Sequence, residues 1–349
     1  MKRLLSKLAL LFVPVFLLVG LVNYVVDPSL LFGTGRVERE MAQAMLNEQN
    51  IANILNYDHR LLQKFYFAGL QQTPDMVVLG SSRSMLVRAS YFPGQRLYNA
   101  AVAGGSVEDF LAIDQVMRNN GHRPKTVILD ISPWVFNRQN GQTRWRSLAS
   151  EYFQALDRLG IDHGLDEYWR SLDVEKYSAL FSLPYLQESL RWANRENSYY
   201  FTERSHTGEV LKLSDGSRVY GDEEEKRSAA ELQKLVSTAV DNLSPFNQLD
   251  PFFMQVFETF VAGLQAEGVE VVFFLAPYPP AMYAADAMQP GAQAVEQYLH
   301  SFAARHGITV VGSYDPAALG CDASEFYDAV HPRPSCIAKL GLEALAGGH

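Results

Sequence analysis

The sequence predicts an α/β protein in which helices cover both faces of a five-stranded parallel sheet, giving three layers, α/β/α. Two observations predict it. Five short, nearly continuous apolar runs are typical of buried strands, and they lie at residues 76–80, 96–102, 125–131, 269–277 and 308–314. Amphipathic helical patterns lie between several of them, at 106–121 and 250–268. Apolar strands that alternate with helices form parallel sheets, and we expect a flavodoxin-like, doubly wound strand order.

The first thirty residues predict a membrane anchor. Lys2, Arg3 and Lys7 precede an apolar stretch from about residue 8 to residue 26, whose length suits the hydrocarbon core of a bilayer. The basic residues favour a cytoplasmic N-terminus, which gives a single-pass protein of the inner membrane with its main domain in the periplasm. A cleaved signal peptide and a buried N-terminal helix are the alternatives. The first of these lacks an A-x-A-like cleavage site after the apolar run.

After the anchor (1–30), residues 31–74 predict one or two amphipathic helices close to the membrane. Residues 75–349 form the predicted sheet domain, interrupted at about 138–249 by a polar and aromatic insertion. The insertion contains a predicted hairpin that turns at Asp215-Gly216, followed by an acidic run at 223–225 that we expect to be a solvated face. An insertion of this length predicts a cap beside a ligand site, with a partner surface as the alternative.

Composition narrows the class of protein further. The 349 residues are 48% hydrophobic and 20% charged, as in folded globular proteins, and the formal net charge is -9. With no Lys/Arg-rich run to offset that charge, nucleic acid is not expected as a partner. Neither histidines nor cysteines show metal-ligand spacing, and no phosphate-binding glycine loop is present, so no metal or cofactor is expected.

Candidate reactive residues follow the predicted strands. Gly80-Ser81-Ser82-Arg83 follows the first strand, Asn99 to Ser106 includes the end of the second, and Asp328 and His331 lie beyond the last. Ligands of open α/β sheets bind beyond the carboxyl ends of the strands, so these loops are expected to meet. A serine hydroxyl needs a base to take its proton, and the base needs a third group to orient it. Ser82, His331 and Asp328 provide one candidate for each role.

Other residues near these loops keep alternative interpretations. Ser81 is an alternative nucleophile, and Asp130 is either a site carboxylate or a helix cap. Arg83 binds an anionic group or, as we favour, pairs with a nearby carboxylate. The backbone N–H groups of Ser82 and Gly104 are candidate donors to a developing oxyanion, because a glycine lets the backbone approach closely.

These blocks resemble the SGNH/GDSL hydrolase superfamily. Gly80-Ser81-Ser82 matches its first block, Asn99 with Gly104 its second, and Asp328-Ala329-Val330-His331 its last. The resemblance covers roughly residues 75–137 and 250–345 and implies the SGNH fold with Ser82 as nucleophile. The third block, Gly-x-Asn-Asp, is missing from "VILDISPWVFN", and Asn137 cannot be assigned to it by pattern. A third oxyanion donor is therefore not identified.

The N-terminal anchor and the degenerate third block resemble an envelope acyltransferase branch of this superfamily. That branch includes the D-alanyl transfer protein of teichoic-acid modification and the alginate O-acetylation proteins. The resemblance implies acyl transfer from a donor to an extracytoplasmic polysaccharide or other polymer, beside a membrane-bound O-acyltransferase as partner. The alternatives are a non-catalytic assembly partner of such an enzyme and a plain secreted esterase.

The two cysteines, Cys321 and Cys336, bracket Asp328 and His331. In an oxidising compartment they could pair across the fourteen residues between them, which would hold the loop of the predicted base. The alternative is two free, buried thiols.

Overall fold

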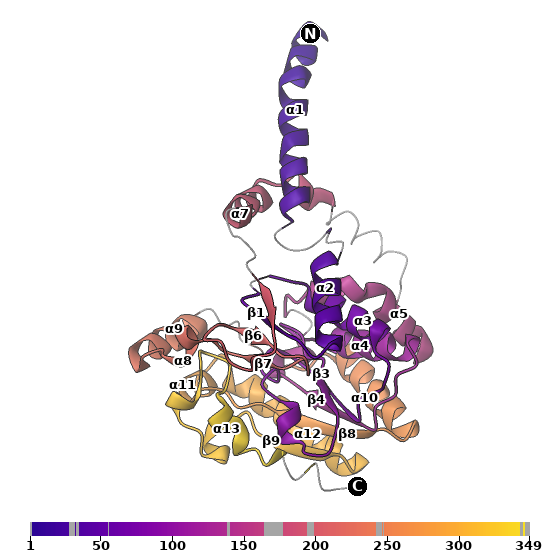
Figure 1. The fold of residues 1–349 in the computed structure, drawn as a ribbon, viewed down its shortest axis with the longest axis vertical. Helices are drawn as coiled ribbons and strands as arrows, with labels where there is room; N and C mark the ends of the chain where they lie inside the picture. Colours follow the sequence, from indigo (N-terminus) through magenta and orange to yellow (C-terminus); the bar gives the residue numbers. More distant parts are fainter. Residues whose placement is uncertain are drawn as a thin grey trace.

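The protein is described from a computed structural model, which covers residues 2–27, 32, 35–54, 56–137, 140–163, 177–193, 199–241, 246, 248–342 and 345. Helix α1 (Lys2–Val26) projects from a body in which helices and short strands surround a central sheet (Figure 1). The segments at the carboxyl ends of the strands of that sheet carry the candidate reactive residues.

The central sheet has five parallel strands, as the sequence predicts. They are β2 (Met76–Leu79), β3 (Leu97–Asn99), β4 (Thr126–Asp130), β8 (Glu270–Leu275) and β9 (Thr309–Gly312). Their order is β3-β2-β4-β8-β9, and each neighbouring pair is parallel. Counted along the chain this is the order 2-1-3-4-5, which belongs to flavodoxin-like sheets. The prediction of an α/β protein with a five-stranded parallel sheet is confirmed.

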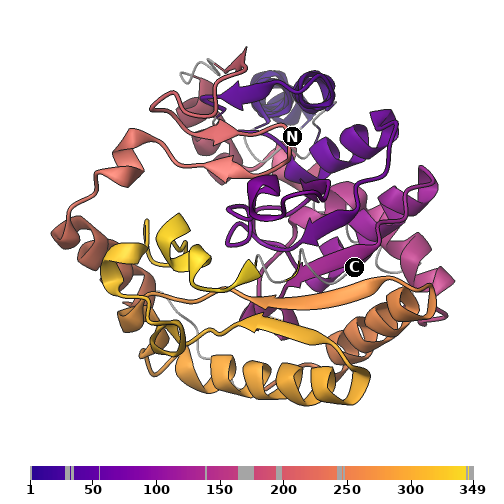
Figure 2. The ribbon, with the colours of Figure 1, turned by 60° about the horizontal axis from the view of Figure 1, so that its bottom comes forward.

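The two faces of the sheet are covered differently. Alternate residues such as Val77 and Phe273 share one hydrophobic core with a set of helices. These helices are α3 (His59–Gly69), α4 (Val107–Asn119), α5 (Ala149–Arg158), α10 (Pro251–Ala266) and α12 (Gln289–His306) (Figure 2). On the opposite face, Val78 and Ile128 pack mainly against residues of turns, such as Leu86.

The predicted layering of helices therefore holds on one face only. On the other face, the helical elements that lie against the sheet are short: the 3-10 segments η1 (Ala89–Tyr91) and η4 (Pro316–Leu319) and the five-residue helix α13 (Pro334–Ala338), among the residues that the structure describes. The connection from β2 to β3 forms tight turns in place of an α-helix. Other helical elements are η2 (Pro133–Phe136), η3 (Arg144–Leu148), α8 (Asp222–Glu225), α9 (Ala229–Asp241), α11 (Pro280–Tyr283) and η5 (Ala323–Glu325).

A second, antiparallel sheet joins the N-terminal segment to the insertion. Its strands, in spatial order, are β5 (Tyr200–Thr202), β1 (Asn50–Ala52), β6 (Leu211–Lys212) and β7 (Arg218–Val219). The antiparallel pairing of β6 with β7 confirms the predicted hairpin, and Gly216 has the positive φ of 82° that its turn requires. Strand β1 was not predicted, since three residues carry too little pattern.

The segment predicted to lie close to the membrane does contain two helices, α2 (Arg36–Leu46) and α3. Both pack onto the sheet domain, because Met41 and Phe67 belong to the same core as the central strands. A buried ion pair at 2.7 Å between Arg60 of α3 and Asp109 of α4 joins them further. This segment is thus part of the body of the protein.

Helix α1 contacts the insertion at its base. There it lies beside helix α7 (Leu183–Ala193), where Ser189 donates to the Asn23 side chain at 2.9 Å (Figure 1). Phe16 and Phe181 stack with ring centroids 4.1 Å apart. Within the described part of the chain, none of the helices meets the combined length and apolarity needed to cross a membrane.

Candidate active site

The turn after β2 is shaped by close packing around Gly80. A side chain at this position would collide with Asp130 and with the Ser84 hydroxyl, each 2.5 Å from the place of its first carbon. Successive backbone hydrogen bonds from Ser84 to Ser81 and from Met85 to Ser82 span three residues each, so the chain forms tight turns here. No α-helix therefore begins at Ser82.

Hydrogen bonds between Ser81 and Asp130 stabilise this turn. Ser81 is 1% exposed, and its backbone N–H and hydroxyl donate to Asp130 Oδ2 at 3.0 and 2.9 Å. Burial raises the pKa of the Asp130 carboxyl, against the opposing effects of the Arg83 charge and the Ser81 hydrogen bonds. Asp130 thus holds the turn and caps no helix, since Ser132 occupies the N-cap of η2. The hydroxyl of Ser81 is engaged with these groups, away from the histidine.

The structure brings Ser82, His331 and Asp328 together in series. Ser82 Oγ lies 2.8 Å from His331 Nε2, and His331 Nδ1 lies 2.9 and 2.8 Å from the two oxygens of Asp328. With the proton on Nδ1, the ring donates to the carboxylate and accepts from the serine hydroxyl. The His331 and Asp328 side chains are 15% and 25% exposed, so the site is open to solvent on one side.

Hydrogen bonds keep Asp328 ionised. Its Oδ1 also accepts from the backbone N–H groups of Val330 and His331, at 2.9 and 3.0 Å. Burial alone would raise the pKa of Asp328, but the hydrogen bond and charge of His331 and these backbone donors outweigh it and lower the pKa to about 2. The carboxylate is therefore a fixed negative charge that orients the imidazole.

Arg83 joins three loops of the site. Its fully buried guanidinium donates to the carbonyls of Ala276 and Pro277, the latter at 2.8 Å, and its Nε donates to Val330 at 3.3 Å. It also lies 3.6 Å above the ring of Tyr278. Among the described residues Arg83 forms no ion pair with a carboxylate, so the favoured prediction is wrong. Backbone carbonyl groups after β8 and before His331 accept the hydrogen bonds of Arg83 in place of a carboxylate.

Asn99 and two glycines position the loop after β3. The Asn99 amide donates to the carbonyls of Ser84 and Val87 at 2.7 and 2.8 Å, which fixes the turn that carries Ser82. A side chain on Gly105 would lie 2.3 Å from the Gly80 carbonyl oxygen, so the two loops are in close contact. Gly104, with φ of 61°, lies next to this contact. Asn99 is thus a positioning residue between the first two loops.

The side chain of Gln142 lies against Gly104 and was missed by sequence reasoning. A carbon added to Gly104 would be 2.6 Å from Gln142 Oε1 and 3.2 Å from Gln142 Nε2. Asn140 accepts from the Gln142 backbone at 2.8 Å and itself donates to the Asn137 carbonyl at 3.0 Å. This hydrogen bond places Asn137 beside Asn140, two residues before Gln142. The position of Asn137 after β4, where the family block is missing, was the one signal in the sequence.

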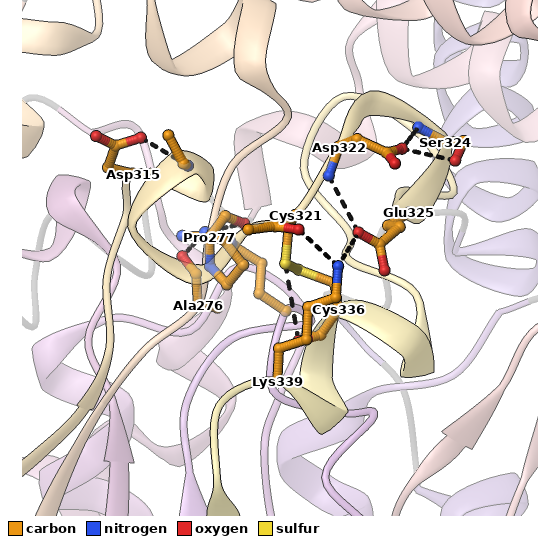
Figure 3. The surroundings of a disulfide bond; sticks show 12 residues. Ala276, Pro277, Asp315, Cys321, Asp322, Ser324, Glu325, Cys336 and Lys339 are labelled. Carbon is orange, nitrogen blue, oxygen red and sulfur yellow. Dashed lines mark hydrogen bonds and ion pairs between the residues drawn. A yellow bond between two sulfur atoms is a disulfide. The ribbon is translucent and has the colours of Figure 1, made fainter.

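Cys321 and Cys336 form a disulfide beside the loop of His331 (Figure 3). Their Cα atoms are 5.5 Å apart, and Ala276 and Pro277 lie in the surroundings of the bond. Arg333 completes the loop, since its backbone N–H donates to Glu325 at 2.7 Å. The pairing of the cysteines, left open by the sequence, is thus present in the structure.

The insertion contacts the same loop. Glu225 of α8 pairs with Arg333 at 2.7 Å and accepts from the Tyr327 hydroxyl at 2.5 Å. Arg227 donates to the Tyr327 carbonyl at 2.9 Å. The acidic run at 223–225 is therefore only partly a solvated face, because Glu225 ties the insertion to the His331 loop.

A cleft of about 940 Å³ separates the rest of the insertion from this loop. Residues 328–330 form one wall, and α8, α9 and the residues between them form the other. Its charged lining includes Lys226, Glu231 and Lys234. The described part of the insertion thus borders the triad, where the sequence predicts a cap.

Throughout the part of the chain that the structure describes, no three His, Cys, Asp or Glu residues are grouped so that they could hold a metal ion.

Fold and site together define an α/β protein with a Ser-His-Asp arrangement at the carboxyl edge of a parallel sheet. The chain belongs to the family DUF1574, described as a protein of unknown function, which matches residues 5–341. No curated protein matches the sequence.

Proposed function

We propose that the protein is a serine acyltransferase or esterase of the SGNH type that acts on acyl groups of a cell-envelope polysaccharide or polymer. One observation carries the proposal, namely the unbroken hydrogen-bond series from Ser82 through His331 to Asp328. The geometry meets the requirement that nucleophile, base and orienting group each lie within hydrogen-bond reach. The strand order and the position of each residue after a strand support the SGNH assignment.

The reaction proceeds in two acyl transfers. His331 Nε2 takes the proton of Ser82 as Oγ attacks the acyl carbonyl carbon of an ester or thioester, and the tetrahedral intermediate carries an oxyanion. Collapse of the intermediate breaks the bond to the leaving group, which receives the proton from His331 and leaves an acyl-Ser82 ester. A hydroxyl of the acceptor, or water, then gives its proton to His331 and attacks that ester. Ser82 regains the proton as the product leaves.

The oxyanion needs donors that are already in position. The backbone N–H groups of Ser82 and Gly104 are two, from loops that touch at Gly80 and Gly105. The Gln142 carboxamide provides a third, because it lies against Gly104 and can turn its N–H₂ group toward the same space. This donor replaces the missing asparagine of the third block.

The envelope setting of the proposal has separate support. Helix α1 exposes large apolar side chains such as Leu10 and Phe12, which are 81% and 62% exposed, and α7 exposes Leu183 and Leu190. Contiguous exposed apolar surface of this kind suits contact with lipid or with an apolar partner. A membrane-bound O-acyltransferase that delivers the acyl donor is the partner we propose for this surface.

The test is labelling with a fluorophosphonate probe, which reacts with activated serines. The wild-type chain is expected to bind one probe molecule, mapped to Ser82 by mass spectrometry, and Ser82→Ala is expected to bind none. Ser90→Ala removes an exposed hydroxyl eight residues further on and serves as the matched control, with labelling unchanged. Equal labelling of wild type and Ser82→Ala would overturn the proposal and favour a non-catalytic partner role.

A further inference from the structure

The hairpin β6–β7 presents two cations and an aromatic ring on one face. Lys212 and Arg218 are directly opposite each other across the two strands, so their side chains share a face of the hairpin. Tyr220, two residues after Arg218, lies on the same face, and the Arg218 guanidinium is 4.6 Å from the centre of its ring. The Lys212 side chain is almost fully buried, with the residue 2% exposed.

This arrangement opposes folding unless an anion compensates it. Like charges that face each other across antiparallel strands are destabilising, and burying an ammonium group costs further free energy. Burial and the Arg218 charge lower the pKa of Lys212 to about 7, although Asp215 opposes the shift. Lys212 donates to the Gly216 carbonyl, a neutral acceptor that leaves its charge unbalanced.

His59 of α3 lies close enough to the hairpin for the charges of Lys212 and Arg218 to act on it. Burial and the charges of Lys212, Arg60, Arg218 and Arg144 lower the pKa of His59 well below its usual value. Of these, Arg60 has a carboxylate partner in Asp109, while neither Lys212 nor Arg218 has one within 4.0 Å among the described residues. In a chain whose net charge is -9, this concentration of cations is a local exception.

The cluster also contains polar atoms that are buried and unsatisfied. Arg218 Nε, His59 Nδ1 and Tyr220 OH have no hydrogen-bond partner among the residues described. Such atoms in a native protein indicate a missing ligand or ordered water. Asp215, whose charge acts on Lys212, is already engaged by the backbone N–H of Ala89 at 2.9 Å and by Ser217 at 2.6 Å.

The cluster is adjacent to the triad. The rings of Tyr220 and His331 are 5.8 Å apart, and the Arg218 backbone donates to Met85, three residues after Ser82, at 2.7 Å. The Asp215 carbonyl accepts from the Asn99 backbone at 2.7 Å, which holds the hairpin turn on the edge strand β3. A substrate group at this cluster would therefore lie beside the loops that carry Ser82 and His331.

We propose that Lys212, Arg218, His59 and Tyr220 form an anion subsite that holds a carboxylate or phosphate group of the acyl acceptor. The inference rests on the proposed function and adds the substrate class, an anionic polymer. Arg218 provides the geometry for two parallel hydrogen bonds to such a group, and Tyr220 links the subsite to His331.

The test measures binding of three oligomers to the full chain by calorimetry. Hexagalacturonate carries a carboxylate on each sugar, maltohexaose is its neutral counterpart, and a glycerol phosphate hexamer carries phosphodiesters. We expect at least one anionic oligomer to bind about tenfold or more tightly than maltohexaose, with an affinity that falls as NaCl rises. The anionic oligomer that binds more tightly shows whether the subsite holds a carboxylate or a phosphate group. Failure of both anions to exceed maltohexaose would overturn the inference.

Two variants distinguish anion binding at the subsite from a general effect of surface charge. Arg218→Gln is expected to reduce anion affinity to the level of maltohexaose. Arg305→Gln removes an exposed charge near the end of α12, at the opposite edge of the sheet, and is expected to leave binding unchanged. Equal weakening by both variants would show a diffuse charge effect and overturn the inference.

Lys212→Met provides a readout that a purely structural role would not give. Replacing an uncompensated buried cation with an apolar side chain of similar length is expected to raise the melting temperature while anion affinity falls. A lower melting temperature with unchanged affinity would contradict the subsite. Probe labelling of Ser82 is measured in parallel: labelling without anion preference rejects the subsite alone, and anion preference without labelling rejects the catalytic proposal alone.

Discussion

Single residues at this site act mostly by fixing loops. Arg83 directly follows Ser82, yet its guanidinium is turned away into the protein, where it binds carbonyls after β8 and before His331. Asn99 does the same from β3 for the carbonyls of Ser84 and Val87. Removing a buried side chain that donates to several fixed acceptors lowers the stability of the fold more than removing one surface contact. The position of the Ser82 hydroxyl therefore depends on residues that do not touch a substrate.

Substitutions of Gln142 test its proposed role as an oxyanion donor. If its carboxamide donates to the oxyanion, Gln142→Ala lowers kcat about 10²- to 10³-fold with little change in KM, because the interaction forms only in the transition state. Gln142→Glu is expected to be slower still, since a carboxylate repels the oxyanion. Steady-state hydrolysis of a short acyl ester measures both, with the exposed Gln154→Ala as control. A kcat for Gln142→Ala within twofold of wild type would exclude this role.

At the scale of elements, the loop that carries Asp328 and His331 is secured from two directions. The disulfide closes it from within, and α8 of the insertion clamps it from outside through Glu225 and Arg333. Among the described residues, no regular strand or long helix supports this loop, so these cross-links replace the rigidity that an element would give. Pre-organised sites require such support.

Removal of the disulfide tests this account. The chain-entropy argument gives a loss of about 3 kcal/mol in unfolding free energy for a closed loop of this length. Cys321→Ser with Cys336→Ser is therefore expected to unfold at a lower denaturant concentration and to turn over substrate more slowly. Urea unfolding with and without reductant measures the first effect. Reductant should alter the wild type and leave the double variant unchanged, because the chain has two cysteines; unchanged wild-type stability would contradict the role.

How much the sequence predicts also differs between elements. The five strands of the central sheet were predictable because each is a buried apolar run bounded by polar turns. The tight turns after β2 were not predictable, because Asp130 and Asn99 bind them from other strands, which no local pattern encodes. Strand β1 and Gln142 were missed for the same reason, since their partners are distant in sequence.

For the whole molecule, Asp328 makes stability depend on pH. Its pKa falls from 3.8 to about 2 on folding, so the folded state binds the proton less tightly than the unfolded chain. The resulting contribution, about 2 kcal/mol, is present above pH 3.8 and is lost as the pH falls toward 2. Asp328→Asn removes it. The melting-temperature difference between wild type and Asp328→Asn should shrink over that acid range, and a difference independent of pH would contradict the assignment.

The small antiparallel sheet has a practical consequence for producing the protein. Strand β1 lies between β5 and β6, so residues 50–52 supply the hydrogen-bond partners for two strands of the insertion. A gene fragment that starts at residue 75, where the strand–helix alternation begins, would leave both strands with an open edge. It would also expose the sheet core that α2 and α3 cover. A truncated version intended for crystallisation should therefore start between α1 and α2, ahead of Arg36.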